Sequence, residues 1–479
     1  MTMPSPARAT AEVALTILYI LVMAWAPFPY GSNRPWASTV LAVMLGALLM
    51  AWAGAVVIGR ARLTPLTQML WLPGVFFAAA VAWALIQTVD LGGLDRVFGG
   101  HGFTSLFAHP IWMMASHALG EGGAFVSVDP ARSLSAIVAT LMAVASFLVA
   151  FELGREPDQA RLIAGAVVVV GCAYAALAFA QSYLGLDTHS WLMADAKPVD
   201  DRLSGPFINP NHFATFAGMA AIAAIALFLE VMLRSVVWDR GGYVLTRTFL
   251  QAVSGLNAIW LACGLLLISS VLLTQSRGGI AAFLVGLVVL LVCISKRTGE
   301  GAPRGALRWM LPSLLLVVVG VAVWIAAAPM FERAQRQGVE DESRAAIAQA
   351  TLKAIAAAPL VGNGFGAFER YYPLYADGSV VGDVDEAHND YLETLADLGL
   401  PAGLAFIATP AMLAFLCVRG AMTRRRDRMF PAVGAAASAL VGAHALVDFS
   451  LQIPAVSLLF TMLLGVGVAQ AWSTVQRAD

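Results

Sequence analysis

The 479-residue chain is 59% apolar and only 12% charged, and its formal net charge is -1. A soluble globular protein usually carries about a quarter charged residues, so this chain has too little polar surface to coat several soluble domains. The composition predicts a polytopic membrane protein and excludes a basic nucleic-acid-binding protein, a secreted disulfide scaffold and a cytosolic Rossmann enzyme. The four cysteines lie singly within apolar runs, so neither a zinc site nor a disulfide framework is expected.

Twelve apolar runs are long enough to cross a bilayer, which takes about 20 residues in a helix. They predict an all-α polytopic fold with about 12 transmembrane helices. The first run ends near an AWA triplet, but Pro27 follows directly and argues against cleavage as a signal peptide, so we expect a span there. The expected spans are about 11–28, 36–58, 68–88, 133–152, 161–184, 212–233, 254–275, 278–295, 309–328, 399–418, 430–448 and 453–472.

The basic residues predict the orientation, because the cytoplasmic loops of membrane proteins are enriched in Lys and Arg. If the N-terminus is cytoplasmic, every short inner link is basic, and the even number of spans returns the C-terminus to the same side. Both termini are therefore expected in the cytoplasm. The residues that fall on this side are Arg8, Arg60, Arg62, Arg155, Arg161, Arg234, Arg240, Arg247, Lys296, Arg297, Arg304, Arg308, Arg419, Arg424, Arg425, Arg426, Arg428 and Arg477.

Three outer segments are too long for simple turns: about 89–132, 185–211 and 329–398. The last contains a helical run ESRAAIAQATLKAIAAAP, a glycine-rich turn VGNGFGAF and a helical stretch DEAHNDYLETLADLGLP. In that final stretch we expect Asp385 as the N-cap and Gly399 with Pro401 as the stop signal.

Three arginines on outer segments, Arg202, Arg277 and Arg344, are not explained by the orientation rule. An Arg at membrane depth costs about 2.5–3.5 kcal/mol on insertion scales unless it meets water, a partner or an anion. A guanidinium stays charged and donates paired hydrogen bonds, so a converging set predicts a diphosphate site without a metal. The structural alternatives are a snorkelling side chain for Arg277 and surface ion pairs for the other two, with Asp200, Asp201, Glu340 or Asp341.

Small and polar residues flank two of these arginines. Ser276, Gly278 and Gly279 surround Arg277, and a turn with two glycines exposes backbone N–H groups that suit a phosphate oxygen. Asn209 and Asn211 lie in a turn that enters the span at 212–233, and we expect Asn211 as its N-cap.

His388 is the candidate for proton transfer, because an imidazole exchanges protons near neutral pH. It is expected in an outer helix, beside Asn389 and close to Tyr391; the alternative is a hydrogen-bonded structural histidine. His444, in the span 430–448 with Asp448 one turn on, is a weaker candidate for packing or a proton-linked pair. The remaining histidines are dispersed in loops: His101, His109, His117, His189 and His212.

Five segments together resemble the O-antigen ligase/polymerase family. They are RLSGPFINPNHFA, LTQSRGG, PLVGNGFGAF, AHNDYLETLADLGLPAG and HALVDFSLQIPAVSLLF, and they cover about residues 200–465. The resemblance implies a membrane-embedded glycosyltransferase of the C type in the bacterial inner membrane, with its active site facing the periplasm. By motif, the family's functional arginines and loop histidine correspond to Arg202, Arg277, Arg344 and His388.

The resemblance also implies a reaction and its partners. The donor is an undecaprenyl-diphosphate-linked glycan and the acceptor a glycan or lipid A-core, without metal, cofactor or nucleic acid. The expected enzyme is therefore an O-antigen ligase or a surface polysaccharide polymerase, acting in lipopolysaccharide or exopolysaccharide synthesis, and displacement opposite an α-linked diphosphate inverts the anomeric carbon.

Two alternatives stay open, a protein O-oligosaccharyltransferase and, in a different class, a polyprenyl-linked glycan flippase. Transporters place charges near the midplane between repeated halves, whereas these candidates gather at one face.

The sequence predicts four parts. They are 1–200 with the first five spans, a ligase-like core at 201–328, a periplasmic loop domain at 329–398 and the C-terminal spans at 399–479.

Overall fold

A computed structural model defines the fold. It describes residues 6–61, 63–64, 70–100, 102–119, 123–186, 202–235, 257–295, 320, 338–380, 382–424 and 426–472. Within these ranges the secondary structure is helical and no strand occurs, so the predicted all-α polytopic membrane fold is confirmed. Seven of the described helices are long and apolar enough to cross a membrane, or eight if α3 (Trp71–Ile86) and α4 (Leu91–Phe98) form one bent span.

Each predicted span within the described residues coincides with a helix; the run 309–328 lies outside them except for residue 320. The spanning and shorter apolar helices, in addition to α3, are α1 (Pro6–Trp25), α2 (Pro35–Val57), α7 (Pro130–Leu153), α8 (Pro157–Leu184), α9 (Pro210–Ser235), α11 (Asn257–Leu273), α12 (Arg277–Ser295), α16 (Asp390–Thr423), α17 (Met429–His444) and α18 (Pro454–Ala469). Outside the bundle lie α4, α5 (Gly102–Phe107), α6 (Pro110–Leu119), α14 (Gly338–Ala357) and α15 (Phe368–Tyr375), and two short 3-10 turns, η1 (Tyr30–Ser32) and η3 (Ser450–Gln452).

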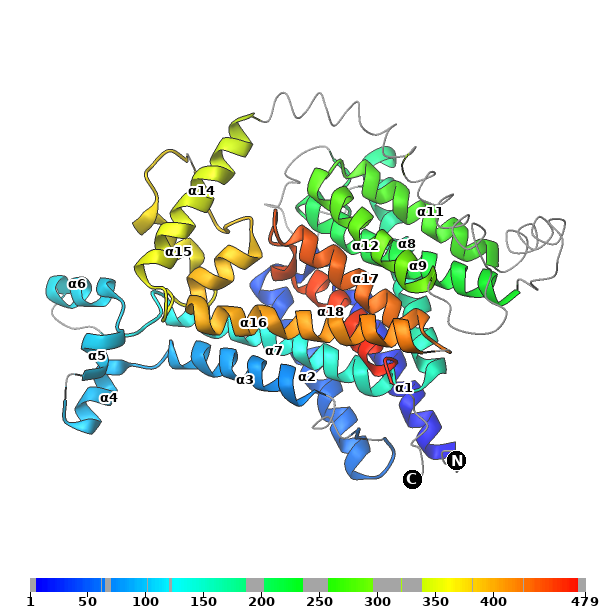
Figure 1. Cartoon of the computed structure of the whole chain (residues 1–479), viewed down its shortest axis with the longest axis horizontal. Coiled ribbons are helices and arrows are strands. Elements are labelled where there is room, and N and C mark those ends of the chain that lie inside the picture. The colour runs from blue at the N-terminus through cyan, green and yellow to red at the C-terminus, as the bar shows by residue number, and fades with distance from the viewer. Residues whose placement is uncertain are drawn as a thin grey trace.

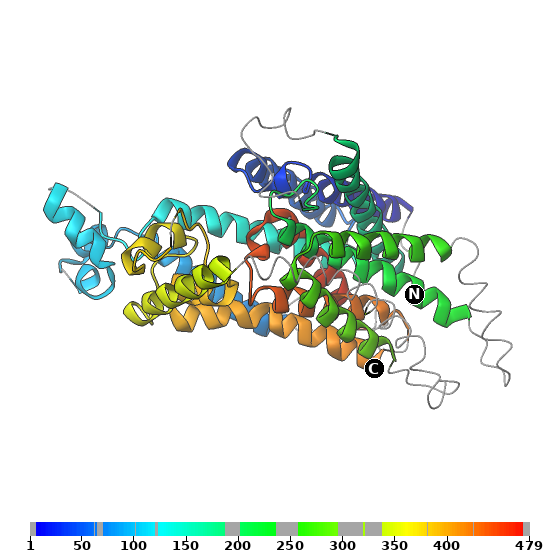
Figure 2. The same ribbon diagram turned by 90° about the horizontal axis from the view of Figure 1, so that it is seen from above.

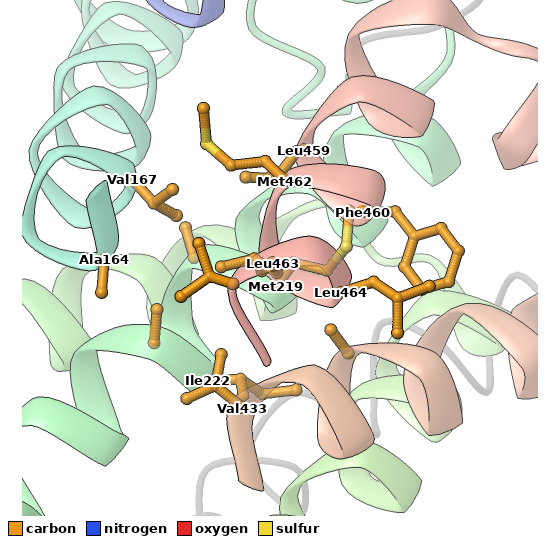
Figure 3. Close-up of a cluster of buried hydrophobic side chains, with 14 of the residues drawn as sticks. Ala164, Val167, Met219, Ile222, Val433, Leu459, Phe460, Met462, Leu463 and Leu464 are labelled. Atoms are coloured by element: carbon orange, nitrogen blue, oxygen red, sulfur yellow. The ribbon is translucent and has the colours of Figure 1, made fainter. Parts of the chain in front are cut away.

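The central helix of the bundle is α9, which packs against α8, α11, α12, α17 and α18 (Figures 1 and 2). Its sequence is rich in alanine, and small side chains let neighbouring helices approach closely in a membrane. On α8, a Cβ added to Gly171 would lie 2.6 Å from the Cβ of Ala220. Figure 3 shows Met219 of α9 beside Leu463 of α18, and Ile222 of α9 beside Val433 of α17.

Arginines cap helix C-termini at the end of the bundle where α1 begins and α18 ends. The Arg155 guanidinium donates to the carbonyl oxygen of Ala469, and Arg428 donates to that of Ile294 at the end of α12. A cation at a helix C-terminus is favourable because the last carbonyls carry partial negative charge. These arginines, which the sequence suggested as topological signals, therefore also hold helix ends together.

A small helical loop domain formed by α14, α15 and the turn between them is attached to the bundle through Gln87. Gln87 is fully buried at the end of α3; its amide nitrogen donates to the carbonyl oxygens of Val361 (2.7 Å) and Asp397 (2.9 Å). Its amide oxygen accepts the N–H of Phe365 at 3.0 Å. The Asp397 carboxylate in turn accepts hydrogen bonds from Gly366 N and Tyr371 Oη. One glutamine and one aspartate thus join α3, α16 and the glycine-rich turn.

The predicted glycine-rich turn packs very closely against the segment before α7. Gly362, Gly364 and Gly366 all have positive φ, a conformation that L side chains rarely adopt. A Cβ at Gly364 would also lie 2.2 Å from the Ser127 hydroxyl oxygen. Only glycine allows the turn to lie this close to the segment before α7.

Replacing Gln87 with Ala should lower the stability of the junction by about 1–3 kcal/mol, because buried backbone groups lose their partners. Thermal unfolding in nanodiscs measures the change. Thr88→Ala, one residue further along and outside this network, is the matched control. An unfolding temperature for Gln87→Ala equal to that of the control would contradict the assigned role.

Candidate functional site

Three histidines from separate parts of the chain surround one buried carboxylate, that of Asp448, which is 1% exposed. The distances are 4.0 Å from His212 Nε2 to Asp448 Oδ1, 3.7 Å from His388 Nδ1 to Oδ1, and 3.9 Å from His444 Nε2 to Oδ2. His212 lies in the first turn of α9, His388 directly precedes α16, and His444 ends α17. These four residues are called the Asp448 cluster.

The imidazoles determine the charge of Asp448. Burial alone would raise the pKa of this carboxyl, but the nearby rings of His388, His212 and His444 outweigh it and shift the pKa far below its usual range. Asp448 is therefore an anion at neutral pH. It can orient an imidazole and stabilise the proton that the ring accepts.

The rings in the cluster are held from several sides. Phe449 packs edge-on against His212 and His388, with ring centroids 4.8 Å and 5.1 Å away. The Nδ1 atom of His444 lies 2.7 Å from the Thr215 hydroxyl and 3.0 Å from the Ser450 hydroxyl. If a hydroxyl donates to Nδ1, the ring proton sits on Nε2, the nitrogen that faces Asp448.

His388 reaches the cluster because its neighbours bind the end of α17. Asn389 Nδ2 donates to the carbonyl oxygen of Leu446 (3.0 Å), Asp390 N donates to that of Ala445 (3.0 Å), and Tyr391 Oη donates to that of Gly442 (2.8 Å). His388 itself has φ +51°, a left-handed conformation for which His is one of the more tolerant residues.

Two details predicted for this segment are wrong. His388 lies before the helix and not in it, and the N-cap is Asn389 instead of Asp385. The Asn389 side-chain oxygen accepts the N–H groups of Tyr391 and Leu392, at 3.1 Å and 3.0 Å. The helix does break at Gly399, as expected, but it continues beyond the kink as the membrane-spanning part of α16.

The SRGG turn lies directly beside the cluster. Ser276 caps α12, since its hydroxyl oxygen accepts the N–H of Gly279 at 3.0 Å, and Arg277 is the exposed first residue of the helix. A Cβ at Gly278 would lie 2.8 Å from Val447 Cγ2 and 3.3 Å from His444 Nε2. The glycine lets the start of α12 pack on the residues adjoining Asp448.

Arg344 approaches the same place from the loop domain. Its Nη1 donates to the carbonyl oxygen of Val447 at 3.5 Å. The alternative partners Glu340 and Asp341 have side chains outside the described residues. The start of α12 and Arg344 thus both meet Val447, the residue before Asp448.

Arg202 begins the segment that leads into α9, and its side chain is half-exposed. The N-cap of α9 is Asn209 and not, as expected, Asn211: the Asn209 side-chain oxygen accepts the N–H of Asn211 at 2.9 Å. Pro210 occupies the first helical position, where proline is favoured. The segment that begins at Arg202 carries His212 into the cluster.

Sequence reasoning missed two members of the site and misjudged a third. The sequence predicts His212 in a loop, but it lies in the first helical turn and faces Asp448. Phe449 was not singled out. Asp448 was expected inside the span with His444, but α17 ends at His444 and Asp448 lies in the following loop. One feature of the sequence points to this arrangement: Asp448 lies between apolar residues and close to His444. Because a buried carboxylate needs partners, such an Asp predicts histidines packed around it.

A second group of carboxylates supports the loop before His388. Glu393 accepts the N–H of Ala387 at 2.7 Å and the Gln452 side-chain N–H at 2.8 Å. Burial raises the pKa of Glu386 well above its usual range, and the nearby Glu393 carboxylate adds to the rise. Across the described ranges, no group of three or more His, Cys, Asp and Glu residues is arranged to hold a metal ion.

The helices define the class: a multi-pass α-helical membrane protein, with the Asp448 cluster at one end of its bundle. The family model described as O-antigen ligase matches residues 262–407, which include Arg277, Arg344 and His388. The match confirms the resemblance to the O-antigen ligase family over this part of the chain. This domain indicates glycosyltransferase activity of the ligase/polymerase type. A comparison with curated proteins gives no match.

The raised pKa of Glu386 predicts a pH dependence of stability. A carboxyl with a raised pKa in the fold contributes stability at low pH, and that contribution is lost as the pH rises through the folded-state pKa. Glu386→Gln should therefore unfold at a higher temperature than the parent at about pH 9 and at nearly the same temperature at about pH 5. Asp383→Asn, at an exposed position, is the control; an equal shift at both pH values would contradict the prediction.

Proposed function

We propose that the protein transfers a glycan from undecaprenyl diphosphate to a glycan or lipid A-core acceptor, at the periplasmic face of the bacterial inner membrane. The observation that carries the proposal is the meeting of three groups around residues 447–448: the start of α12 with Arg277, the guanidinium of Arg344 and the imidazole of His388. A proton acceptor and anion-binding groups at one place suit displacement of a diphosphate.

The arginines would bind the diphosphate. Arg277 stands at the N-terminus of α12, where the helix dipole favours an anion. Arg344 donates to the carbonyl oxygen of Val447, whose side chain meets the start of α12, so the two guanidinium groups would bind one diphosphate. Arg202 is proposed as the third. Fixed cations stabilise the negative charge that develops as the polyprenyl diphosphate departs, so the reaction requires no metal on this account.

His388 would act as the base, or orient the acceptor. Its Nδ1 faces Asp448 at 3.7 Å, which leaves Nε2 for the acceptor hydroxyl. The acceptor oxygen attacks the anomeric carbon, the bond from that carbon to the phosphate oxygen breaks, and the hydroxyl proton passes to Nε2. Asp448 stabilises the resulting imidazolium, and attack opposite an α-linked leaving group inverts the anomeric carbon.

The side of the membrane is supported by charge. The end of the bundle opposite the Asp448 cluster carries Arg155, Arg424 and Arg428, as expected for a cytoplasmic face. The cluster would then face the periplasm, where lipid-linked glycans are available as donors and nucleotide sugars are not.

His388→Asn should lower the rate of glycan transfer by about 10²–10⁴-fold, because a general base is lost while the left-handed backbone remains accessible to Asn. Arg277→Ala should lower it as well. The assay uses purified protein in nanodiscs with an undecaprenyl-diphosphate glycan, candidate acceptors and a chelator. Arg370→Ala is the matched arginine control, because Arg370 on α15 pairs with Asp129, the N-cap of α7, and not with a residue of the Asp448 cluster.

Full activity of His388→Asn and Arg277→Ala would refute the assigned roles. Loss of the product on adding chelator would refute metal independence. Translocation of the lipid-linked glycan without a new glycosidic bond would favour a flippase, and transfer to a protein alone would favour a protein O-oligosaccharyltransferase.

The packing of Gly278 allows a separate test of the site's geometry. Gly278→Ala should slow transfer, because the new methyl group meets Val447 Cγ2 at 2.8 Å and displaces the start of α12. Adding Val447→Ala removes that methyl group and should restore part of the rate, a coupling that a double-mutant cycle measures. Additive losses in the double variant would show that this contact does not position Arg277.

A further inference from the structure

The three short helices α4, α5 and α6, here called the α4–α6 arm, project from the end of α3 and stand apart from the bundle in both views (Figures 1 and 2). The arm is tied to the segment before α7 by backbone hydrogen bonds from Leu91 to Ala124 and from His109 to Phe125. Asp95, buried within the arm, accepts the N–H groups of Phe103 and Thr104 at the start of α5. These hydrogen bonds give the arm a defined structure.

The outer surface of the arm is unusually apolar. Between residues 91 and 119 the only Asp, Glu, Lys or Arg residues are Asp95 and Arg96. Four large apolar side chains are more than two-thirds exposed: Val97 (77%), Phe98 (71%), Leu106 (74%) and Met114 (71%). Clusters of exposed apolar side chains on this scale mark a surface that another apolar phase covers.

The apolar surface is continuous with the lipid-facing side of α3. Val75, Leu85 and Ile86 are exposed on α3, which in a multi-pass membrane protein means contact with lipid. Val89 continues the exposed series into the arm. The axes of α3 and α4 differ by 84°, so α4 turns out of the direction of the span and towards the plane of the membrane.

We propose that the α4–α6 arm lies on the bilayer as an interfacial anchor, with Phe98 and Leu106 among the acyl chains at the end of the bundle that carries the Asp448 cluster. A helix perpendicular to a span, with large apolar side chains exposed on its surface, is suited to the boundary between headgroups and acyl chains. The partner is the lipid surface itself. The continuous apolar surface from α3 and the scarcity of charge favour lipid over a protein partner.

The test measures where residues 98 and 106 lie in nanodiscs of phosphatidylethanolamine and phosphatidylglycerol. A nitroxide is attached to Phe98→Cys or Leu106→Cys after the four native cysteines are replaced, and its accessibility to oxygen, which concentrates in lipid, is compared with that to a water-soluble nickel chelate. Val75→Cys on α3 provides the lipid reference and Asp377→Cys, on the exposed loop domain, the water reference.

The proposal expects an oxygen-to-nickel ratio at 98 and 106 severalfold above that at 377 and close to that at 75. A ratio like that at 377 would overturn it by placing the arm in water. Low accessibility to both reagents would overturn it in favour of a second copy or another protein. If the cysteine-free protein does not fold, a photoreactive phenylalanine at either position in the native chain replaces the nitroxide. Crosslinks to lipid then support the proposal. Crosslinks to protein only, or no crosslink because the side chain reacts with water, refute it.

Discussion

The buried carboxylate of Asp448 is the constraint on which the site depends. An ion withdrawn from water is expensive, and a protein tolerates one only when partners compensate. Here the partners are imidazoles on three different parts of the chain, so the start of α9, the start of α16 and the end of α17 must meet around one residue. The loop after α17 turns this carboxylate inward, whereas Leu446 and Val447 beside it are exposed.

The rest of the architecture follows from holding these ends in place. The small residues of α9 let α8, α12, α17 and α18 surround it closely, which fixes His212 and His444 on rigid helices. His388 lies on a loop and needs a different support: Asn389 and Tyr391 fasten it to the end of α17, while Glu393 holds the backbone just before it. The loop domain brings Arg344 and is itself fixed to the bundle through Gln87 and Asp397. Helix packing and local hydrogen bonds together thus hold the three histidines around Asp448.

The sequence predicted the helices well, because a run of about 20 apolar residues in a membrane protein has few alternatives to a spanning helix. It was less successful at helix ends. Asn209 and Asn211 are equally good caps by residue type, and Pro210 at the first helical position decides between them. Asp385 and Asn389 compete in the same way, and the hydrogen bond from Asn389 to the end of α17 decides between them.

His212 and Asp448 are more than two hundred residues apart in the sequence, so periodicity and spacing cannot predict their contact. Arg277, Arg344 and His388 were identified as isolated polar residues on outer segments, and the fold places Arg344 and the turn that holds Arg277 against the residue before Asp448.

The most direct test of this account is a double-mutant cycle between Asp448→Asn and His388→Asn in the rate of glycan transfer. If Asp448 acts by orienting the His388 ring and stabilising its proton, each single variant is slow and the double variant is no slower than His388→Asn alone. Losses that multiply in the double variant would show that the two residues act independently. That result would contradict the central claim that the buried carboxylate organises the histidine of this site.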